Sequence, residues 1–193
     1  MRKLIEMVEF SLMYHPRYKH SVGVMKMAIK LNEIHNLNVD NDAIKLASLL
    51  HDVTKTNTNE DNLSIIERCL NDIIDDELLD SPSIWHAFSG MVVARDQYHI
   101  VNEDVLNAIY YHTTGRPNMS NLEKLIFLSD YIEMNRIGKN FEEIRLIAYK
   151  NIDQAIISMY EKQFEYLENN NRSIYKLSKL AYEYYKKEIN DDR

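Results

Sequence analysis

Apolar residues recur along most of the chain at intervals of three and four positions, the spacing that gathers them on one face of an α-helix. One such stripe begins after Pro16, runs to about Asn36 and includes Val22, Met25, Ile29 and Leu31. Another follows Asp40, a suitable helix N-cap, and includes Ala43, Ile44, Ala47 and Leu50. No clear alternation of the kind expected for a β-strand is present. The pattern predicts an all-α fold.

Residues that start or stop helices mark out the middle of the chain. Helices are expected at about 60–70, from Pro82 to about Tyr98, and after Asn102, which is placed to cap the helix leading to His112. The acidic run at 72–80 is expected to be a solvated loop with short helical pieces.

Ser120 and Glu123 have the spacing of a capping box and open the next helix, which carries Asp130 and ends by Gly138. Two more helices are expected near 141–168 and 172–189. The apolar stripe of the first fits either an ordinary core or a dimer face, so a homodimer remains open. The tyrosines of the second are expected to pack rather than to stack on a base; they are Tyr175, Tyr182, Tyr184 and Tyr185.

The length of 193 residues fits a single domain. We expect one domain over residues 1–193, a helical bundle with its core at about 15–135 and a C-terminal helical extension at about 141–189.

Composition narrows the classes of partner and cofactor. The formal net charge of −7 gives no general basic surface for a nucleic acid polymer or an anionic membrane, so a phosphate ligand needs a local source of positive charge. The single cysteine, Cys69, excludes a thiolate cluster as a metal site. No segment approaches the length of a membrane span. We expect a cytoplasmic protein.

The pair His51-Asp52 follows directly on the buried leucines of a predicted helix. Polar groups beside a core need partners, and at a helix end the backbone can turn so that an imidazole and a carboxylate converge on one ion. A simple C-terminal cap would also explain the pair, since His-Asp is a common dipeptide.

Other residues strengthen the case for a metal. His20, His86, His112 and Asp130 each lie within or at the end of a different predicted amphipathic helix. Any one of them alone fits a hydrogen-bonded core histidine or a solvated aspartate. It would be a much rarer coincidence for all five helices to carry such a residue independently. Nitrogen and oxygen ligands without thiolates favour iron, manganese, zinc or related ions.

The pattern His20, His51-Asp52, Asp130 resembles that of the HD-domain superfamily of helical metal-dependent phosphohydrolases. Finer motifs resemble one branch, the YqeK-type symmetrical bis(5'-nucleosyl)-tetraphosphatases. They are Leu-Leu-His-Asp-Val-Thr-Lys at 49–55, Tyr-His-Thr-Thr-Gly-Arg at 111–116 and Asp-Tyr-Ile-Glu at 130–133. Two residues depart from the family pattern. Thr54 stands before Lys55 where alanine is more usual, and Met134 stands where a proline often follows the Asp-Tyr-Ile-Glu motif.

The resemblance implies a centre of two divalent ions, iron in this family, with manganese or zinc as alternatives. One ion would be held by His20, His51, Asp52 and Asp130, and the other by His86, His112 and a bridging Asp52. Two divalent ions carry +4 against the two carboxylates, a local excess of +2 that suits a polyphosphate. A water bridging the ions would become a hydroxide nucleophile, which makes Asp52 part of the catalytic machinery.

Basic and hydroxyl side chains near the motifs are candidate substrate contacts. Lys55 is expected to contact a phosphate oxygen and stabilise charge in the transition state; the alternative is a solvated lysine. Thr113, Thr114, Gly115 and Arg116 either bind phosphate or form a helix C-cap with Arg116 at the surface. Arg17 and Arg136 are further candidates.

The resemblance implies symmetrical hydrolysis of diadenosine tetraphosphate, or a close relative, to two nucleoside diphosphates. Alternatives are an HD-domain phosphohydrolase for another nucleotide, a catalytically silent nucleotide-binding sensor, and a plain helical interaction module without metal.

Overall fold

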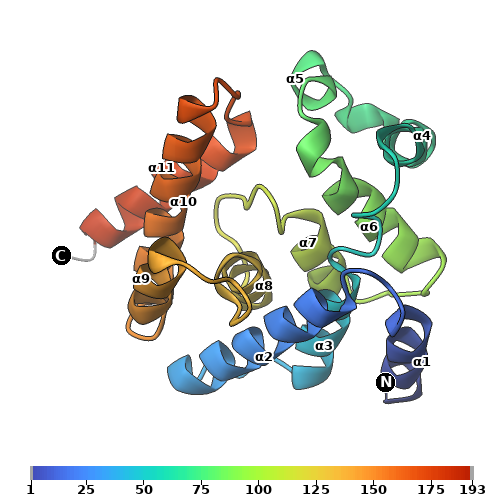
Figure 1. The fold of residues 1–193 in the computed structure, drawn as a ribbon, viewed down its shortest axis with the longest axis horizontal. Coiled ribbons are helices and arrows are strands. Elements are labelled where there is room, and N and C mark those ends of the chain that lie inside the picture. The colour runs from blue at the N-terminus through green and yellow to red at the C-terminus, as the bar shows by residue number, and fades with distance from the viewer. Residues whose placement is uncertain (1, 192–193) are drawn as a thin grey trace.

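The computed structural model describes residues 2–191, and the regular elements within this range are all helical (Figure 1). The α-helices are α1 (Arg2–Leu12), α2 (Tyr18–His35), α3 (Asn41–Leu50), α4 (Asn59–Cys69), α5 (Asp76–Leu79), α6 (Trp85–Asp96), α7 (Glu103–Tyr110), α8 (Asn121–Ile132), α9 (Lys139–Ala148), α10 (Ile152–Asn169) and α11 (Lys176–Asp191). Two short 3₁₀ turns, η1 (Asn71–Ile73) and η2 (Pro82–Ile84), connect α4, α5 and α6. The predicted all-α class is confirmed.

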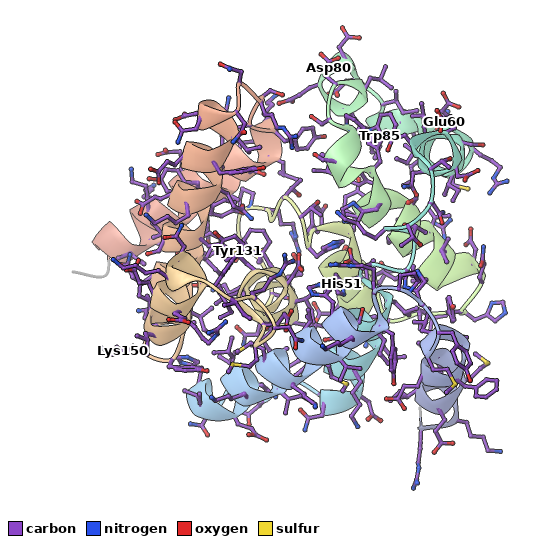
Figure 2. All side chains as sticks on the ribbon, viewed as in Figure 1. His51, Glu60, Asp80, Trp85, Tyr131 and Lys150 are labelled. Atoms are coloured by element: carbon purple, nitrogen blue, oxygen red, sulfur yellow. The ribbon has the colours of Figure 1, made fainter. Side chains whose placement is uncertain are left out.

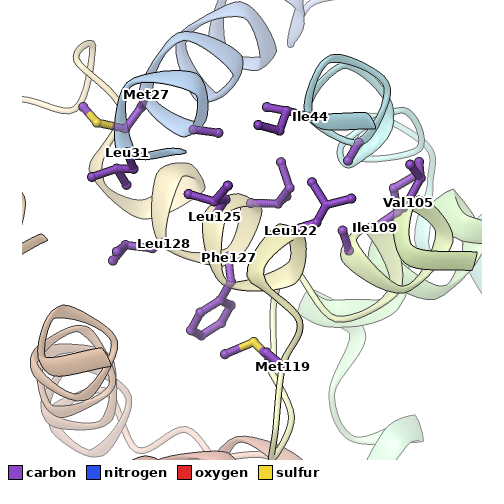
Figure 3. Close-up of a cluster of buried hydrophobic side chains, with 14 of the residues drawn as sticks. Met27, Leu31, Ile44, Val105, Ile109, Met119, Leu122, Leu125, Phe127 and Leu128 are labelled. Carbon is purple, nitrogen blue, oxygen red and sulfur yellow. The ribbon is translucent and has the colours of Figure 1, made fainter. Parts of the chain in front are cut away.

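Helix α8 is the centre of the arrangement (Figure 1). It packs against α2 and α3 on one side, α7 on another, and α9 and α10 on a third. Figure 3 shows apolar side chains of α8 beside those of α2, α3 and α7. The labelled residues of this core are Met27, Leu31, Ile44, Val105, Ile109, Met119, Leu122, Leu125, Phe127 and Leu128, and all are buried. Since α8 is covered almost all round, the position of Asp130 near its end is fixed by packing.

The C-terminal helices belong to the same core as α8. Ala155, Ile156 and Met159 of α10 are buried in it, so the apolar stripe that fitted either a core or a dimer face is core. Two tyrosines connect these helices to the segment between α7 and α8: the Tyr160 hydroxyl donates to Thr114 O at 2.8 Å, and Tyr185 Oη accepts from Met119 N at 2.9 Å. The prediction that the tyrosines of the last helix pack is confirmed for Tyr185.

A second, smaller apolar cluster joins α4, α5 and α6. Its buried members are Ile66, Leu78, Trp85 and Phe88. The acidic run forms η1 and α5, as expected, and α5 contributes Leu78 to this cluster. The cluster supports α6, the helix that carries His86.

One boundary and one whole helix differ from the prediction. The helix expected at 141–168 is divided into α9 and α10, because Asn151 adopts an extended backbone and its side chain accepts a hydrogen bond from Gln154 N, which starts a new helix. Helix α1 was not among the predicted helices; it buries Ile5, Val8 and Leu12. Among the described residues, no helix is both long enough and apolar enough to cross a membrane.

Candidate metal centre

His51 and Asp52 lie where α3 ends. The His51 N–H still donates to Ala47 O at 2.9 Å, and the chain then continues in tight turns, with Lys55 N bonded to Asp52 O at 3.0 Å. The two side chains converge, since His51 Nε2 lies 3.5 Å from Asp52 Oδ2. Figure 2 shows His51 in the interior of the molecule, whereas Glu60, Asp80 and Lys150 lie at its periphery.

Two histidines are oriented by the backbone of their own segment. His51 Nδ1 lies 2.7 Å from Ser48 O, and His112 Nδ1 lies 2.7 Å from Ile109 O. A carbonyl oxygen only accepts hydrogen bonds, so Nδ1 carries the proton in both rings. The lone pair of each Nε2 therefore faces the centre, as in histidines that bind metals.

Asp52 lies between two pairs of histidines. Its Oδ2 is 3.5 Å from His51 Nε2 and 3.8 Å from His20 Nε2. Its Oδ1 is 3.4 Å from His86 Nε2 and 3.6 Å from His112 Nε2. One carboxylate oxygen of Asp52 thus faces each pair of histidines.

Asp130 completes the cluster from α8. Its Oδ1 lies 2.9 Å from His20 Nε2, and ligand atoms of His20, His51 and Asp130 all lie within 4.8 Å of one another. His51, Asp52 and His112 form a second group by the same measure. The structure therefore brings together all six side chains that the sequence suggested as metal ligands, from five separate helical segments.

Burial keeps two imidazoles of the centre, those of His51 and His86, neutral. It lowers the pKa of His51 to about 4 and that of His86 to about 2. Burial raises the pKa of Asp52, but the surrounding histidines lower it by more, so this carboxyl group is ionised. The side chain of Asp130 is 24% exposed while His51 is fully buried, so the centre opens on the Asp130 side.

This donor set fits divalent metal ions. The lone pairs of His51 and His112 and the carboxylates of Asp52 and Asp130 face one small, mostly buried volume, where acceptors repel one another and a cation is attracted. Imidazole nitrogens with carboxylate oxygens suit iron, manganese and zinc.

Glu133 is a buried residue behind the centre that the sequence reasoning did not single out. Its Oε1 lies 3.3 Å from His20 Nδ1, while its Oε2 accepts from Asn135 N at 2.7 Å. Gly23 makes room for it, because a Cβ at position 23 would fall on Glu133 Oε2. Its place at the end of the Asp-Tyr-Ile-Glu motif at 130–133, directly after the apolar Ile132, was the available signal. Glu133 orients His20 toward the other candidate ligands.

Thr54, which departs from the usual family pattern, ties the His51-Asp52 segment to α6. Its hydroxyl donates to His86 O at 2.9 Å and lies 2.8 Å from Ser89 Oγ. Ser89 in turn donates to Asn62 Oδ1 at 2.7 Å. The residue therefore helps to hold the backbone of His86 in place.

Three of the predicted substrate contacts converge on the centre. Arg17 donates to Asp52 Oδ2 at 2.7 Å, Lys55 Nζ lies 3.2 Å from His86 Nε2, and Arg136 Nη2 lies 3.3 Å from Asp130 Oδ1. Burial lowers the pKa of Lys55. These cations come from three segments and supply the local positive charge that the net charge of −7 required.

The segment after His112 is engaged in packing. Thr114 is fully buried, and Gly115, at φ 63°, lies against Tyr160 so closely that a Cβ there would fall on the tyrosine hydroxyl. Arg116 forms two hydrogen bonds of 2.7 Å with the buried Glu123. The buried hydroxyl of Thr113 has no hydrogen-bond partner among the described residues.

Two histidines outside the centre make specific contacts. His15 lies in the α1–α2 turn, where its Nδ1 accepts from Arg17 N at 3.2 Å. His35 is half-buried, and its Nε2 lies 2.7 Å from Ala148 O, which connects the end of α2 to α9. His35 is thus a packing residue rather than a surface one, because α9 covers it.

Comparisons with known proteins agree with this geometry. The sequence profile of the family described as HD domain matches residues 17–135, which contain all six candidate ligands. A solved structure from Clostridium acetobutylicum, titled as a predicted HD superfamily hydrolase involved in NAD metabolism, superposes with a TM-score of 0.86. The two chains are 32% identical, and the match covers 97% of each.

Curated relatives cover most of the chain. The protein is 38% identical to the symmetrical bis(5'-nucleosyl)-tetraphosphatase of Halalkalibacterium halodurans, over 90% of each chain. It is 36% identical to the protein of the same name from Bacillus subtilis, over 86% of this chain and 87% of the relative. It is 33% identical to the Staphylococcus aureus protein of that name, over 88% of this chain and 86% of the relative.

Proposed function

Because the chain belongs to the HD domain family, we propose that it hydrolyses dinucleoside tetraphosphates symmetrically, with diadenosine tetraphosphate as the substrate to test first. The names of its relatives support this substrate class. The observation that carries the proposal is the position of Asp52, with one carboxylate oxygen toward His20 and His51 and the other toward His86 and His112.

The proposed ligand sets follow from this division. His20, His51, Asp52 and Asp130 would hold one divalent ion, and His86, His112 and Asp52 a second; iron is proposed, with manganese or zinc as alternatives. Divalent ions bound here would polarise phosphate oxygens and lower the pKa of water toward neutrality.

The reaction adds water across the central phosphoric anhydride. A bond forms between the water oxygen and one of the two middle phosphorus atoms, and the bond from that phosphorus to the bridging oxygen breaks. The products are two nucleoside diphosphates, and the two hydrogens of the water stay on the two new terminal phosphate groups or leave as two protons when both groups ionise.

Arg17, Lys55 and Arg136 are the proposed phosphate contacts. Each has its cationic group within 3.3 Å of a candidate metal ligand, so a phosphate at the centre is within their reach. Lys55 is the residue proposed to stabilise the charge that develops at the reacting phosphate. A contribution of Thr113, Thr114, Gly115 and Arg116 stays a prediction from the sequence, as do a cytoplasmic location and the oligomeric state.

The test combines metal analysis with product identification. Purified protein is assayed for bound iron, manganese and zinc, then incubated with diadenosine tetraphosphate and each metal, and the products are separated by chromatography. ADP as the sole nucleotide product is expected. AMP together with ATP would contradict symmetrical cleavage, and a metal-free protein unable to take up any metal would contradict the proposal altogether.

Asp52→Asn is the decisive variant, with Asp72→Asn, on the exposed side of η1, as its matched control. Loss of one carboxylate charge at the centre should lower kcat/KM by at least about 100-fold and reduce metal content, whereas the control should resemble the wild type in both. Equal activity in the two variants would remove Asp52 from the mechanism.

A further inference from the structure

A hollow of about 750 Å³ lies beside the metal centre, between the end of α8, the start of α9 and one face of α10. It shares Asp130 and Arg136 with the centre. Tyr131, which also lines it, lies on the side of α8 that faces the C-terminal helices (Figure 2). This volume is within the range of sites that bind small molecules. The metal centre also opens on the Asp130 side, so the hollow adjoins its exposed face.

Aromatic rings form much of the wall. The rings of Tyr131 and Phe141 have centroids 5.1 Å apart, and Tyr166 contributes a ring from α10 that is 58% exposed. Flat apolar rings at the edge of an open hollow suit a planar heterocycle, because base and ring can stack.

The polar groups of the hollow suit a neutral ligand better than a phosphate. Asn140 and Gln163 line it, and a carboxamide both donates and accepts hydrogen bonds, as the edge of a nucleobase requires. The two lysines of the rim each have a carboxylate nearby: Lys139 lies 3.6 Å from Glu143, and Lys162 lies 3.7 Å from Glu165. These carboxylates partly balance the charge of the two lysines. On the side of the hollow nearest the metal centre, the cationic side chain is that of Arg136.

We propose that this hollow binds the nucleoside at one end of the substrate, with the base against Tyr166 and Phe141 and the attached phosphates passing Arg136 to reach the metal centre. This inference rests on the proposed function, since it assigns a binding site to one part of that substrate. It makes Tyr166 and Gln163 specificity residues, although neither is a candidate metal ligand.

The test compares Tyr166→Ala and Gln163→Ala with Leu146→Ala. Leu146 lies on the neighbouring α9, is 63% exposed and does not line the hollow, so it controls for removal of an exposed side chain. Loss of one stacking ring should raise the KM for diadenosine tetraphosphate on the order of tenfold in Tyr166→Ala, with kcat little changed. The Leu146 variant should retain the wild-type KM.

Inhibition separates the nucleoside from the phosphates. AMP and inorganic pyrophosphate are each titrated as inhibitors of the wild type and of the variants. The inhibition constant of AMP should rise in Tyr166→Ala and Gln163→Ala, while that of pyrophosphate stays unchanged. An equal rise for both inhibitors would mean that the hollow holds phosphates, which overturns the inference.

Failure of the inference is distinct from failure of the proposed function. If the wild type cleaves diadenosine tetraphosphate and both variants keep its KM and its AMP inhibition constant, the hollow is not the nucleoside site and the hydrolase proposal stands. If the wild type does not cleave the substrate, calorimetric titration of AMP into the metal-loaded proteins still decides. Weaker AMP binding by Tyr166→Ala supports a nucleoside site, and unchanged binding overturns it.

Discussion

At the scale of single residues, the orientation of the candidate histidine ligands depends on groups that are not themselves candidate ligands. His51 and His112 are oriented by carbonyl oxygens of their own segments, which any sequence with the same backbone would provide. His20 differs, because its Nδ1 faces a side chain, Glu133, that is 2% exposed. The orientation of His20 can therefore be changed by mutation without altering a ligand.

Glu133→Gln tests this positioning role. The amide keeps the shape of the side chain but removes the charge that holds the His20 Nδ1 proton, so we expect metal affinity to fall by about 10- to 100-fold. The measurement is competition for metal with a chelator of known affinity. Glu142→Gln, an exposed change on α9, is the control. Unchanged affinity in Glu133→Gln would show that the buried carboxylate only supports the fold.

At the scale of elements, the starts of helices were readable from the sequence because capping is local chemistry. The side chains of Asp40, Asn102 and Ser120 accept hydrogen bonds from the first turns of α3, α7 and α8, as predicted. The sequence also pointed to the six candidate ligands, because they are polar residues within apolar helical stripes. Four of them also match the order of histidines and aspartates in the HD-domain pattern.

The remaining features depend on contacts between segments far apart in sequence. Glu123 was expected to reach back to its own helix start, but its carboxylate binds Arg116 instead. The hollow beside Asp130 is formed by residues of α8, α9 and α10, separated by up to 36 positions (from 130 to 166), and no local pattern announces it. The same holds for the contact of His35 with α9.

The Arg116–Glu123 pair links the segment after α7 to α8, and its removal should destabilise the fold. Glu123 is 1% exposed, so Arg116→Met leaves a buried carboxylate without its partner, at a cost of about 3 kcal/mol in the free energy of unfolding. The double variant Arg116→Met with Glu123→Leu should recover most of this loss, because an apolar pair replaces a buried ion pair. Urea denaturation measures both.

Kinetics of the double variant separate the two roles of Arg116. If the guanidinium also contacts phosphate, KM for the substrate stays raised after stability has been restored. If the residue acts only through Glu123, KM returns to the wild-type value. No recovery of stability in the double variant would contradict the account of the pair.

At the scale of the whole molecule, the C-terminal helices are not an accessory. The family profile ends at residue 135, yet α10 and α11 contribute Tyr160 and Tyr185 to the principal core. The only tryptophan, Trp85, belongs to the separate cluster of α4, α5 and α6. Its fluorescence therefore reports on one side of the molecule, whereas far-UV circular dichroism reports on every helix.

We expect these two probes to give one coincident thermal transition, because α6 and α8 are joined through α7 and the candidate metal centre. Metal at about 100 times its dissociation constant should stabilise the folded chain by about 2.7 kcal/mol and raise Tm by roughly 5–10 °C in both probes. A metal shift confined to one probe, or two separate transitions, would contradict a single cooperative domain.

The spread of the candidate ligands along the chain, from His20 to Asp130, has a consequence for biosynthesis. While the protein is being made, the first four candidate ligands, from His20 to His86, leave the ribosome long before α8 does, and His20 and His51 cannot yet meet Asp130. Capture of the ion proposed for His20, His51, Asp52 and Asp130 can only accompany or follow the docking of α8, since a site of this kind does not exist in the unfolded chain. For this ion, the nearly finished protein, rather than the nascent one, would thus select the metal from whatever the cell makes available.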